Sequence, residues 1–335
     1  MTGKRRPTLM DVAEAAGVSR ALVSIVMRDV PGASDATRRR VQEAAQALGY
    51  RPDSRARLLR SSRTRLLGVS FSTSQPFHSE IVDAAYAAAQ LRGYEIALSA
   101  VANGRPEPRA VEALLDLGCE ALILISPTLG VRQLAGYTAR IPVVSLLRDD
   151  AGESVDSVSS DDHAGIRIAV EHLTSLGHRR IAHVDGGEAV SAAQRRDAFR
   201  QEMLARGLDP QNIPGGPYEE AGMEAGIQLR DNMPTAVIAF NDRCALGVIE
   251  SLRAAGLRVP EDVSVLGYDD SQFARLSYVQ LSSISQDAPL LAAAAVERAI
   301  DRLEGSGPPA HFVGTPHLVL RKTTAPPASQ SQPNG

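Results

Sequence analysis

The sequence lacks the features of an exported, membrane-bound or metal-containing protein. It has only two cysteines among 335 residues, Cys119 and Cys244, which are far apart and each set in apolar sequence. This setting is typical of reduced core thiols rather than of a disulfide or a metal site. No run of about 18 apolar residues is present, and residues 1–12 lack the apolar stretch of a signal peptide. We therefore expect a cytoplasmic protein that does not contact membranes.

Motifs for enzymatic chemistry are also missing. Neither G-x-G-x-x-G after a strand nor G-x-x-x-x-G-K-[ST], the two glycine-rich patterns that bind nucleotide phosphates, occurs. His172, His178 and His183 do not have the spacing of a metal-binding pair, and they are predicted to be packing or surface residues. The acids at 149–150 and 161–162 are better interpreted as helix caps or ligand hydrogen-bonders than as a catalytic pair. We expect neither an enzyme nor a cofactor.

Charge is divided unevenly along the chain. Residues 1–65 carry 14 Lys and Arg against 6 Asp and Glu, whereas the other 270 residues carry 22 against 33. A basic head on an acidic body suits the phosphate backbone of a nucleic acid, because each neutralised phosphate releases counterions. The charge pattern therefore predicts a nucleic-acid-binding head and a separate body.

Residues 8–28 predict two short helices around a tight turn. Thr8 with Asp11 forms a capping pattern, Gly17 suits the left-handed end of the first helix, and Ser19 can cap a second helix over 20–28. The outer face of this second helix carries Arg20, Ala21, Ser24, Ile25 and Arg28. An ordinary amphipathic helix pair is the alternative for these residues alone. The basic charge, and a third helix predicted between Ser34 and Gly49, favour a helix-turn-helix with an open reading face.

From residue 66 the pattern changes to alternating strands and helices. The predicted strands are 66–72, 95–100, 121–126, 142–147, 180–185, 236–240 and 263–268. The predicted helices are 79–92, 109–117, 163–176 and 242–255. Short apolar strands alternating with helices indicate parallel sheets covered on both faces. The strands fall into two runs separated near 154–162, which predicts two doubly wound lobes with a ligand cleft at the carboxyl ends of their strands.

Several separated segments resemble the LacI/GalR (lactose-repressor/galactose-repressor) family of bacterial transcription regulators. They are residues 8–28, 37–59 (TRRRVQEAAQALGYRPDSRARLL), 161–186 (DDHAGIRIAVEHLTSLGHRRIAHVDG), 239–270 (AFNDRCALGVIESLRAAGLRVPEDVSVLGYDD) and 283–287 (SISQD). The resemblance implies an N-terminal three-helix helix-turn-helix head plus a hinge helix, followed by a two-lobed periplasmic-binding-protein-like core of doubly wound parallel sheets. In that fold the chain crosses between the lobes three times, here expected near 160, 287 and 312.

The resulting domain prediction has four parts. The head is 1–50, the hinge helix and linker are 51–64, the core is 65–327, and the tail 328–335 is expected to be disordered. Within the core, the first lobe takes about 65–160 and 288–311, and the second takes 161–287 and 312–327. No terminal leucine heptad of the kind that makes some relatives tetrameric is present, so a homodimer is expected.

The hinge segment allows two interpretations. Its composition alone favours a solvated basic linker. The resemblance instead implies a helix that folds in the minor groove, where Leu59 would insert as a wedge between base pairs beside Arg55 and Ala56. The residues expected to contact DNA are thus Thr8, Ser19, Arg20, Ala21, Ser24, Ile25 and Arg28 in the head and Arg55, Ala56 and Leu59 in the hinge. Leu22, Ile25 and Arg28 stand where the family usually has Thr, Arg and Asn, which predicts an unusual operator.

The core residues expected to bind a small polar effector are Phe77, His78, Asp161, Arg195, Asn241 and Asp269. Asn241 and Asp269 directly follow predicted strands, and the family's residues at these positions commonly bind effector hydroxyls. Arg195 matches the arginine of the family's R-x-x-G-F segment, although Ala198 replaces the glycine. Ala288 stands where the family often has an aromatic residue, which leaves the apolar wall of the pocket undefined.

These expectations combine into a dimeric, ligand-responsive repressor that binds a pseudopalindromic double-stranded DNA operator. A sugar-like effector is expected, with a purine-like corepressor as the alternative. The rival classes are a solute-binding protein for transport, which would need a signal peptide and no basic head, and an enzyme, which would need a catalytic set.

Overall fold

The protein is described by a computed structural model that covers residues 7–27, 29–50, 63–305 and 307–328. The chain divides into two compact units, Met1–Thr64 and Arg65–Gly335. Most of the expected hinge and nearly all of the expected disordered tail lie outside the described residues.

The described residues of the first unit form three helices, α1 (Leu9–Ala16), α2 (Arg20–Met27) and α3 (Asp35–Leu48). Thr8 and Asp11 form the expected capping box, and Gly17 ends α1 with a left-handed φ of 61°. Ser34 caps α3, and Gly49 ends it in the same left-handed way. Val12, Val23 and Val41, one from each helix, are completely buried together. Three short helices therefore share one small apolar core, as the sequence predicts.

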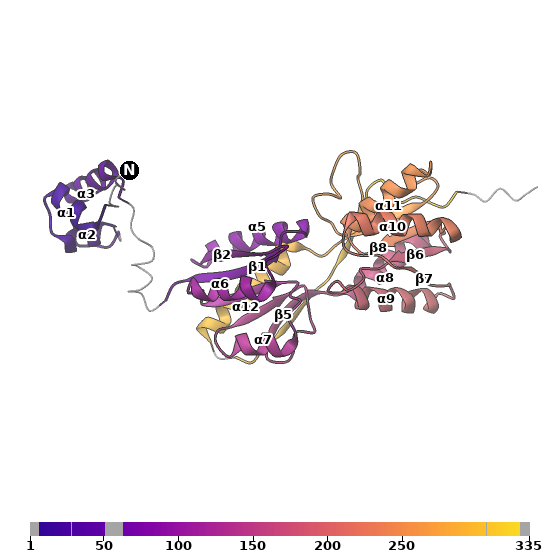
Figure 1. Ribbon diagram of the computed structural model, residues 1–335, viewed down its shortest axis with the longest axis horizontal. Coiled ribbons are helices and arrows are strands. Elements are labelled where there is room, and N and C mark those ends of the chain that lie inside the picture. Colours follow the sequence, from indigo (N-terminus) through magenta and orange to yellow (C-terminus); the bar gives the residue numbers. More distant parts are fainter. Residues whose placement is uncertain (1–6, 28, 51–62, 306, 329–335) are drawn as a thin grey trace, which may run out of the picture. The chain divides into compact units, whose positions relative to one another are not determined.

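The second unit contains two lobes, each built on a six-stranded sheet (Figure 1). The first sheet has the order β11-β5-β4-β3-β1-β2 and is parallel throughout. Its strands are β1 (Leu66–Ser72), β2 (Glu95–Val101), β3 (Ala121–Ile125), β4 (Val143–Leu146), β5 (Asp156–Ser160) and β11 (His311–Gly314). Its helices are α5 (Pro76–Leu91), α6 (Glu107–Asp116), α7 (Val131–Thr138) and α12 (Ala288–Glu304).

The second sheet has the order β12-β10-β9-β8-β6-β7, with only β12 antiparallel to its neighbour. Its strands are β6 (Ile181–Val184), β7 (Gln211–Ile213), β8 (Ala236–Ala239), β9 (Ser264–Asp269), β10 (Ser282–Ser285) and β12 (His317–Val319). Its helices are α8 (Asp162–Ser175), α9 (Ala192–Ala205), α10 (Glu219–Gln228) and α11 (Asp242–Ala254), with a 3₁₀ turn η1 (Leu229–Asn232).

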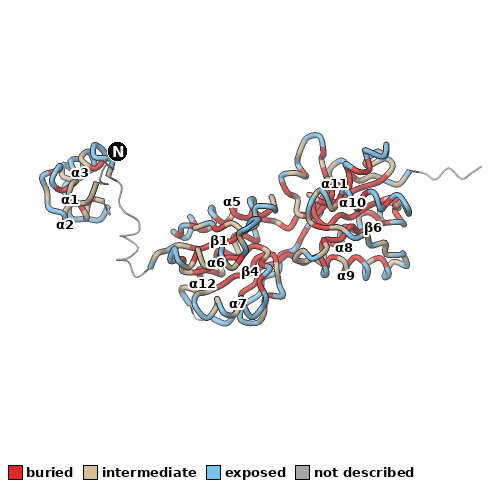
Figure 2. The backbone as a smooth tube through the Cα atoms, viewed as in Figure 1, coloured by how far each residue is buried: buried red, intermediate tan, exposed pale blue. Residues whose placement is uncertain are grey.

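Each sheet is buried on both faces, because alternate side chains of its strands feed two separate cores. In β3, Ile123 packs into the core under α5 and α12, while Leu122 and Leu124 pack into the core under α6 and α7. In β8, Val237 packs toward α10 and α11, while Ile238 packs toward α8 and α9. Figure 2 shows the result as buried strands inside helices whose outer faces are exposed. The continuous apolar runs in the sequence are thus explained by two-sided burial.

The chain passes between the lobes at three places. The first passage lies between β5 and α8, and the second between β10 and α12, close to the expected positions near 160 and 287. The third expected position, near 312, was wrong, because His311–Gly314 forms β11 of the first sheet. The chain crosses at residues 315 and 316, between β11 and β12.

Residues 154–162 were expected to separate the two runs of strands, but Asp156–Ser160 is a fully buried strand of the first sheet. Its polar sequence, DSVSS, is unlike that of a typical buried strand, but several of its polar groups find partners inside the protein. Asp156 accepts hydrogen bonds from Arg298 and from the Ala310 amide, and the Ser157 hydroxyl bonds to His311. A buried strand need not be apolar when its side chains have partners.

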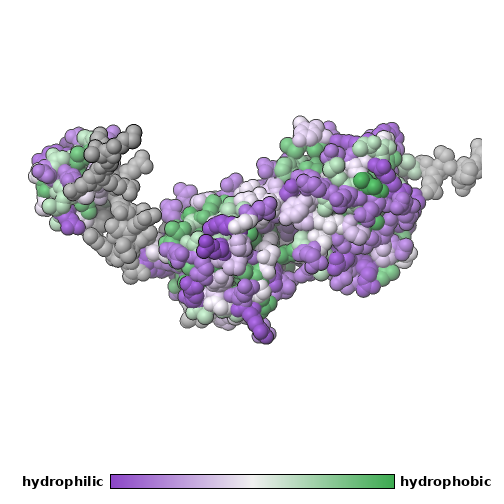
Figure 3. Space-filling model, viewed as in Figure 1, coloured by the Kyte–Doolittle hydropathy of each residue, from purple (hydrophilic) through white to green (hydrophobic). Residues whose placement is uncertain are grey.

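The surface differs between the lobes. On the face seen in Figure 3, hydrophilic residues predominate over the second lobe. On the first lobe, large apolar side chains are exposed on neighbouring elements: Tyr86 and Leu91 on α5 are 41% and 87% exposed, and Leu98 on β2 is 39% exposed. Exposed apolar side chains on neighbouring elements make this part of the first lobe a candidate interaction surface.

Candidate functional site

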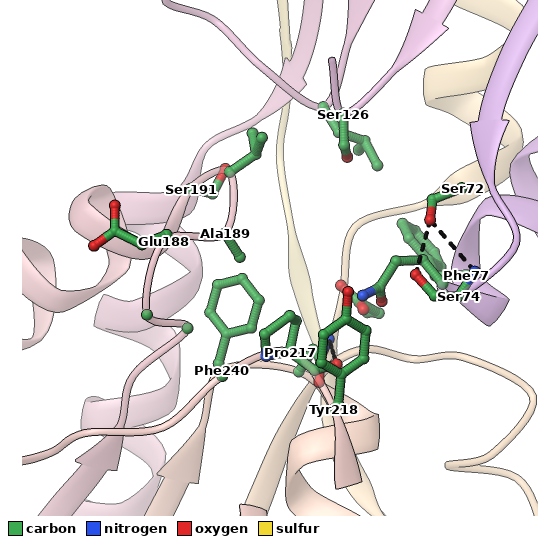
Figure 4. Close-up of a pocket in the computed structure, with 18 of the residues that line it drawn as sticks. Ser72, Ser74, Phe77, Ser126, Glu188, Ala189, Ser191, Pro217, Tyr218 and Phe240 are labelled. Atoms are coloured by element: carbon green, nitrogen blue, oxygen red, sulfur yellow. Dashed lines mark hydrogen bonds between the residues drawn. The ribbon is translucent and has the colours of Figure 1, made fainter. Parts of the chain in front are cut away.

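A cavity of about 440 Å³ lies between the two lobes. Its lining residues follow the carboxyl ends of strands from both sheets: Ser72, Ser126 and Leu147 from the first, and Gly186, Phe240, Asn241, Asp269 and Gln286 from the second. Parallel strands bring these ends to one edge of each sheet, which is where α/β proteins bind ligands. Figure 4 shows the side chains of both lobes around the cavity.

Backbone strain is concentrated in this lining. Ser126, Leu147, Ser191 and Asp269 all have left-handed φ angles, of 48°, 66°, 66° and 107°. Such angles disfavour side chains other than glycine, and they persist where the surrounding structure enforces them. The turns at Ser126 and Leu147 also explain why β3 and β4 end one residue earlier than predicted. Strain gathered at one cavity indicates a binding site.

Arg195 is the charged centre of the cavity. It is only 4% exposed, its Nε donates to Asp162 at 2.7 Å, and its Nη1 donates to the Phe240 carbonyl at 2.7 Å. Its guanidinium also lies 3.6 Å from the centre of the Tyr268 ring. Burial has the largest single effect on the pKa of Arg195 and lowers it, but Asp162, Tyr268 and Asp269 together raise it above its ordinary value, so the side chain is charged. The adjacent Asp162 carboxylate compensates the positive charge of Arg195, and the remaining N–H groups of the guanidinium are available to a ligand in the cavity.

Two further polar groups line the second-lobe side. Asp269 accepts a hydrogen bond from Gln286 at 2.7 Å, and burial raises its pKa to about 8. This shift favours the protonated carboxyl group, in which Asp269 can both donate and accept. Asn241 is 4% exposed; its Oδ1 caps α11 by accepting from the Cys244 amide, and its Nδ2 donates to the Pro217 carbonyl. Asn241 thus positions the loop before α10 as well as facing the cavity.

Asp242 plays a different part from the helix cap that its position suggests. Asn241 caps α11, and the buried Asp242 carboxylate instead accepts from the Ser271 amide and hydroxyl and from the Ser283 hydroxyl. Gly267 gives it room, because a Cβ there would lie 2.3 Å from the Asp242 Oδ1. Asp242 therefore anchors the turn that follows Asp269.

On the first-lobe side, Phe77 and His78 lie in the first turn of α5 rather than before the helix as expected. The Ser72 amide donates to the His78 Nδ1 at 3.1 Å, so the ring proton is on Nε2. Burial lowers the pKa of His78 to about 4, which keeps the ring neutral. His78 therefore offers a single fixed donor, and Phe77 offers an apolar ring beside it.

Rings that the sequence did not reveal complete the apolar wall. Tyr218 and Phe240 both line the cavity, and Figure 4 shows their rings projecting into it. Phe240 could have been found, because it is the last residue of the strand predicted at 236–240. Tyr218 follows β7, which is short and polar and was not predicted. Ala288, which stands where the family often has an aromatic residue, is buried in the first-lobe core.

Glycines form the second-lobe floor. Gly186, Gly187, Gly215 and Gly216 line the cavity, and Asp185 beneath them accepts from the amides of Gly187 and Gly215. A Cβ at Gly186 would lie 2.5 Å from the Phe240 ring. The floor of the cavity is therefore glycine backbone packed close to the Phe240 ring, and no side chain projects from it into the cavity.

Five of the six expected effector residues line the cavity: Phe77, His78, Arg195, Asn241 and Asp269. Asp161 does not. Its carboxylate caps α8 by accepting from the Ala164 amide at 2.9 Å, so its expected place in the pocket was wrong. The neighbouring Asp162, which holds Arg195, is the acid that serves the site.

The first unit presents a different surface. Arg20 and Ala21 are exposed on α2, and Ser24 and Ile25 are half-buried, with Ile25 next to Gly32. Thr8 and Ser19 use their hydroxyls as helix caps, Ser19 accepting from the Leu22 amide at 3.2 Å. Arg28, Arg55, Ala56 and Leu59 lie outside the described residues.

The described ranges hold no group of three or more His, Cys, Asp or Glu side chains that could bind a metal ion. None of their helices has the length and apolar character needed to cross a membrane. His178 and His183 are buried and bonded to Thr235, the Ala325 carbonyl and the Ile238 carbonyl, which makes them packing residues.

Two family models match the chain. Residues 8–53 match "Bacterial regulatory proteins, lacI family", and residues 170–324 match "Periplasmic binding protein-like domain". The regulator CelR of Thermobifida fusca is 31% identical over 96% of this chain and 100% of its own. A solved CelR–cellobiose complex is 30% identical, with a TM-score of 0.69 over 95% of this chain and all of that one.

Two other solved structures are similar over much of the chain. A LacI transcriptional regulator from a Rhodococcus species is 46% identical, with a TM-score of 0.76 over 78% of this chain and 98% of its own. The lac repressor dimer bound to operator and an anti-inducer is 31% identical, with a TM-score of 0.84 over 96% of this chain and all of its own. These relatives are regulators and not enzymes. The chain therefore belongs to the LacI family of bacterial transcription regulators.

Proposed function

We propose that this regulator binds a pseudopalindromic operator as a homodimer and acts as a repressor controlled by an uncharged, polyhydroxylated small molecule, most simply a sugar. The observation that carries the proposal is the joining of a basic helix-turn-helix unit to a strained, ring-lined cavity between two lobes. A transport solute-binding protein would have the cavity without the head. The DNA target places the site of action in the cytoplasm.

The pocket chemistry supports an uncharged ligand. The positive charge of Arg195 is already paired with Asp162 at 2.7 Å, and the raised pKa of Asp269 removes a second charge at neutral pH. An anion would therefore meet no free positive charge among these residues. Rings from Phe77, Tyr218 and Phe240 suit the apolar faces of a sugar, while Asp269, Gln286 and His78 suit its hydroxyls. The solved CelR relative is named as a cellobiose complex.

The head supports recognition of DNA through its exposed α2 face. Arg20 is exposed there, and an arginine can hold guanine through two hydrogen bonds. We infer that Ala21, Ser24, Ile25 and Arg28 contact neighbouring bases or phosphates, and that Thr8 and Ser19 present the helix ends to the backbone. Arg55, Ala56 and Leu59 are proposed to enter the minor groove once two hinges meet.

The first lobe supplies a surface for the second copy. Tyr86, Leu91 and Leu98 expose apolar area on α5 and β2, which are adjacent in the fold. The lac repressor relative is named as a dimer bound to operator. Dimerisation through the first lobe would fix the spacing of two heads on two operator half-sites.

The proposal is tested by selecting bound sequences from random double-stranded DNA and measuring affinity by fluorescence anisotropy. We expect a pseudopalindrome, and we expect Arg20→Ala to lose preference at one base in each half-site, at roughly 1–3 kcal/mol. Arg39→Ala is the matched control, because Arg39 is an exposed arginine on α3 and its loss should weaken all sequences alike. Absence of any sequence preference in the full chain would overturn the proposal.

The effector is sought by thermal-shift screening of neutral mono- and disaccharides, sugar phosphates and purines. A neutral sugar should raise the melting temperature and change operator affinity. A response confined to sugar phosphates or purines would contradict the uncharged-polyol assignment while leaving the DNA-binding proposal intact.

A further inference from the structure

Two bridges connect the lobes beside the cavity. In the first, Glu80 on α5 of the first lobe accepts from the Gln272 amide of the second lobe at 2.6 Å and from the Arg275 guanidinium. In the second, Arg243 on α11 donates to the Ser74 carbonyl of the first lobe and to Glu219 of its own lobe. Both bridges use charged groups, and both first-lobe partners lie at or next to the start of α5.

Each bridge is tied directly to the wall of the cavity. Ser74 lines the cavity, and the Arg243 guanidinium lies 5.2 Å from the centre of the Tyr218 ring. Figure 4 shows Ser74 and Tyr218 on the same side of the cavity. Arg243 does not line the cavity itself, so it acts on a ligand through these two neighbours.

The Glu80 bridge reaches the cavity through the turn after β9. The Arg275 Nη2 that meets Glu80 also donates to the Asp270 carbonyl at 2.8 Å. Asp269 and Asp270 both have left-handed φ angles, 107° and 51°, and Asp269 lines the cavity. The Asp270 carboxylate is in turn paired with Arg321 at 2.6 Å. One strained turn therefore carries a ligand-facing carboxyl at one end and the inter-lobe contact at the other.

We propose that Glu80, Arg275 and Arg243 form an electrostatic latch that holds the two lobes closed along the α5 edge of the cavity. The lobes are joined by three chain passages, so their relative angle is set by contacts such as these. The Glu80 and Arg275 side chains are 24% and 50% exposed, which makes this bridge weak enough to open and sensitive to salt. The regulatory meaning of the latch, that an effector touching Asp269 shifts the equilibrium between open and closed lobes, rests on the proposed function.

The test measures lobe separation in the full chain with neither effector nor DNA. Spin labels are placed on Arg109→Cys in α6 and Arg200→Cys in α9, exposed positions in different lobes, and distances are measured by double electron–electron resonance in protein diluted with unlabelled chain. The two native cysteines are buried. Glu80→Gln keeps the side-chain shape and removes the charge. We expect it to raise the ratio of open to closed molecules by about threefold at low salt, the scale of one half-exposed ion pair.

Three comparisons make the result specific. Asp83→Asn is the matched control, because Asp83 is an exposed acid one turn further along α5, and it should behave as the unaltered chain. Arg275→Gln should open the lobes as Glu80→Gln does, and the two changes together should open them no further than either alone, because both remove the same ion pair. Arg243→Gln should open the lobes without touching Glu80. Unchanged distances in Glu80→Gln, or additive effects of Glu80→Gln and Arg275→Gln, would overturn the latch and leave the proposed effector and operator untouched.

Discussion

Replacing Arg195 by lysine isolates what the guanidinium does from what the charge does. Lysine keeps the positive charge beside Asp162 but cannot also reach the Phe240 carbonyl, and it lacks the flat face that lies 3.6 Å from the centre of the Tyr268 ring. Losing a hydrogen bond from a charged donor costs about 1.5–3 kcal/mol, and losing the ring contact costs about 0.5–2 kcal/mol. We therefore expect the free energy of unfolding to fall by about 2–5 kcal/mol.

The assay is thermal denaturation of the full chain, with and without any sugar found in the screen. A loss of this size in a unit this large lowers the melting temperature by roughly 4–20 °C. The ligand-induced shift should also disappear, because the remaining N–H groups of the fork no longer face the cavity.

Arg196→Lys is the matched control. Arg196 is the next residue on α9, its side chain is 41% exposed, and its pair with Asp185 is 3.2 Å long. A surface pair contributes about 0–1 kcal/mol, so its melting temperature should fall by less than roughly 3 °C and its ligand response should survive. If Arg195→Lys melts like the unaltered chain and still responds to ligand, the anchoring role derived for the guanidinium is wrong.

Three other changes test separate parts of the structure. Asp269→Asn should flatten the pH dependence of stability. Burial raises the folded-state pKa of Asp269 to about 8 from an ordinary 3.8, so the folded chain holds an extra proton between these pH values, and the unaltered protein loses unfolding free energy as the pH rises from about 4 to 8. If this is wrong, urea denaturation at several pH values would show the same dependence of unfolding free energy on pH in both proteins. Gly247→Ala should destabilise the protein by at least about 1–3 kcal/mol, because the new Cβ would lie 2.0 Å from the Glu219 carbonyl of α10. Gly136→Ala should instead stabilise it by up to about 1 kcal/mol, because Gly136 is exposed in α7 and a Cβ there would have no atom within 4 Å. Equal effects of the two changes in denaturant melts would refute the packing argument. Thr8→Ala removes one side of a capping box and should destabilise the first unit by about 1 kcal/mol, seen as faster amide exchange in α1.

Sequence patterns predicted the strands whose own residues indicate that they are buried. The predicted strands at 66–72 and 236–240 lie within a residue of β1 and β8, because apolar runs reflect two-sided burial. Strands made of serine, such as β10 with the sequence SSIS, were missed, because their hydroxyls find partners only in the folded chain: Ser283 bonds to Asp242, and Ser282 to Thr324. Local pattern carries no information about partners about 40 residues away.

The same limit applies to the cavity. Residues directly after predicted strands, such as Asn241 and Asp269, could be placed there because parallel strands share an edge. The choice between Asp161 and Asp162 could not be made, because only the direction of the helix start decides which carboxylate caps α8 and which reaches Arg195. The ring of Tyr218 was equally hidden, because it enters the cavity from a loop beside a polar edge strand.

The order of the strands has a consequence for how the protein is made. Helix α12 and strand β11 belong to the first lobe, yet they leave the ribosome only after every helix of the second lobe. Until then the first sheet has five strands, and the apolar side chains under α12, among them Ile123 and Val144, lack the cover of Leu291 and Val296. The lobe whose translation begins first therefore stays incomplete until nearly all of the second lobe has been made, and a nascent chain stopped near residue 287 would carry an open apolar face that chaperones recognise.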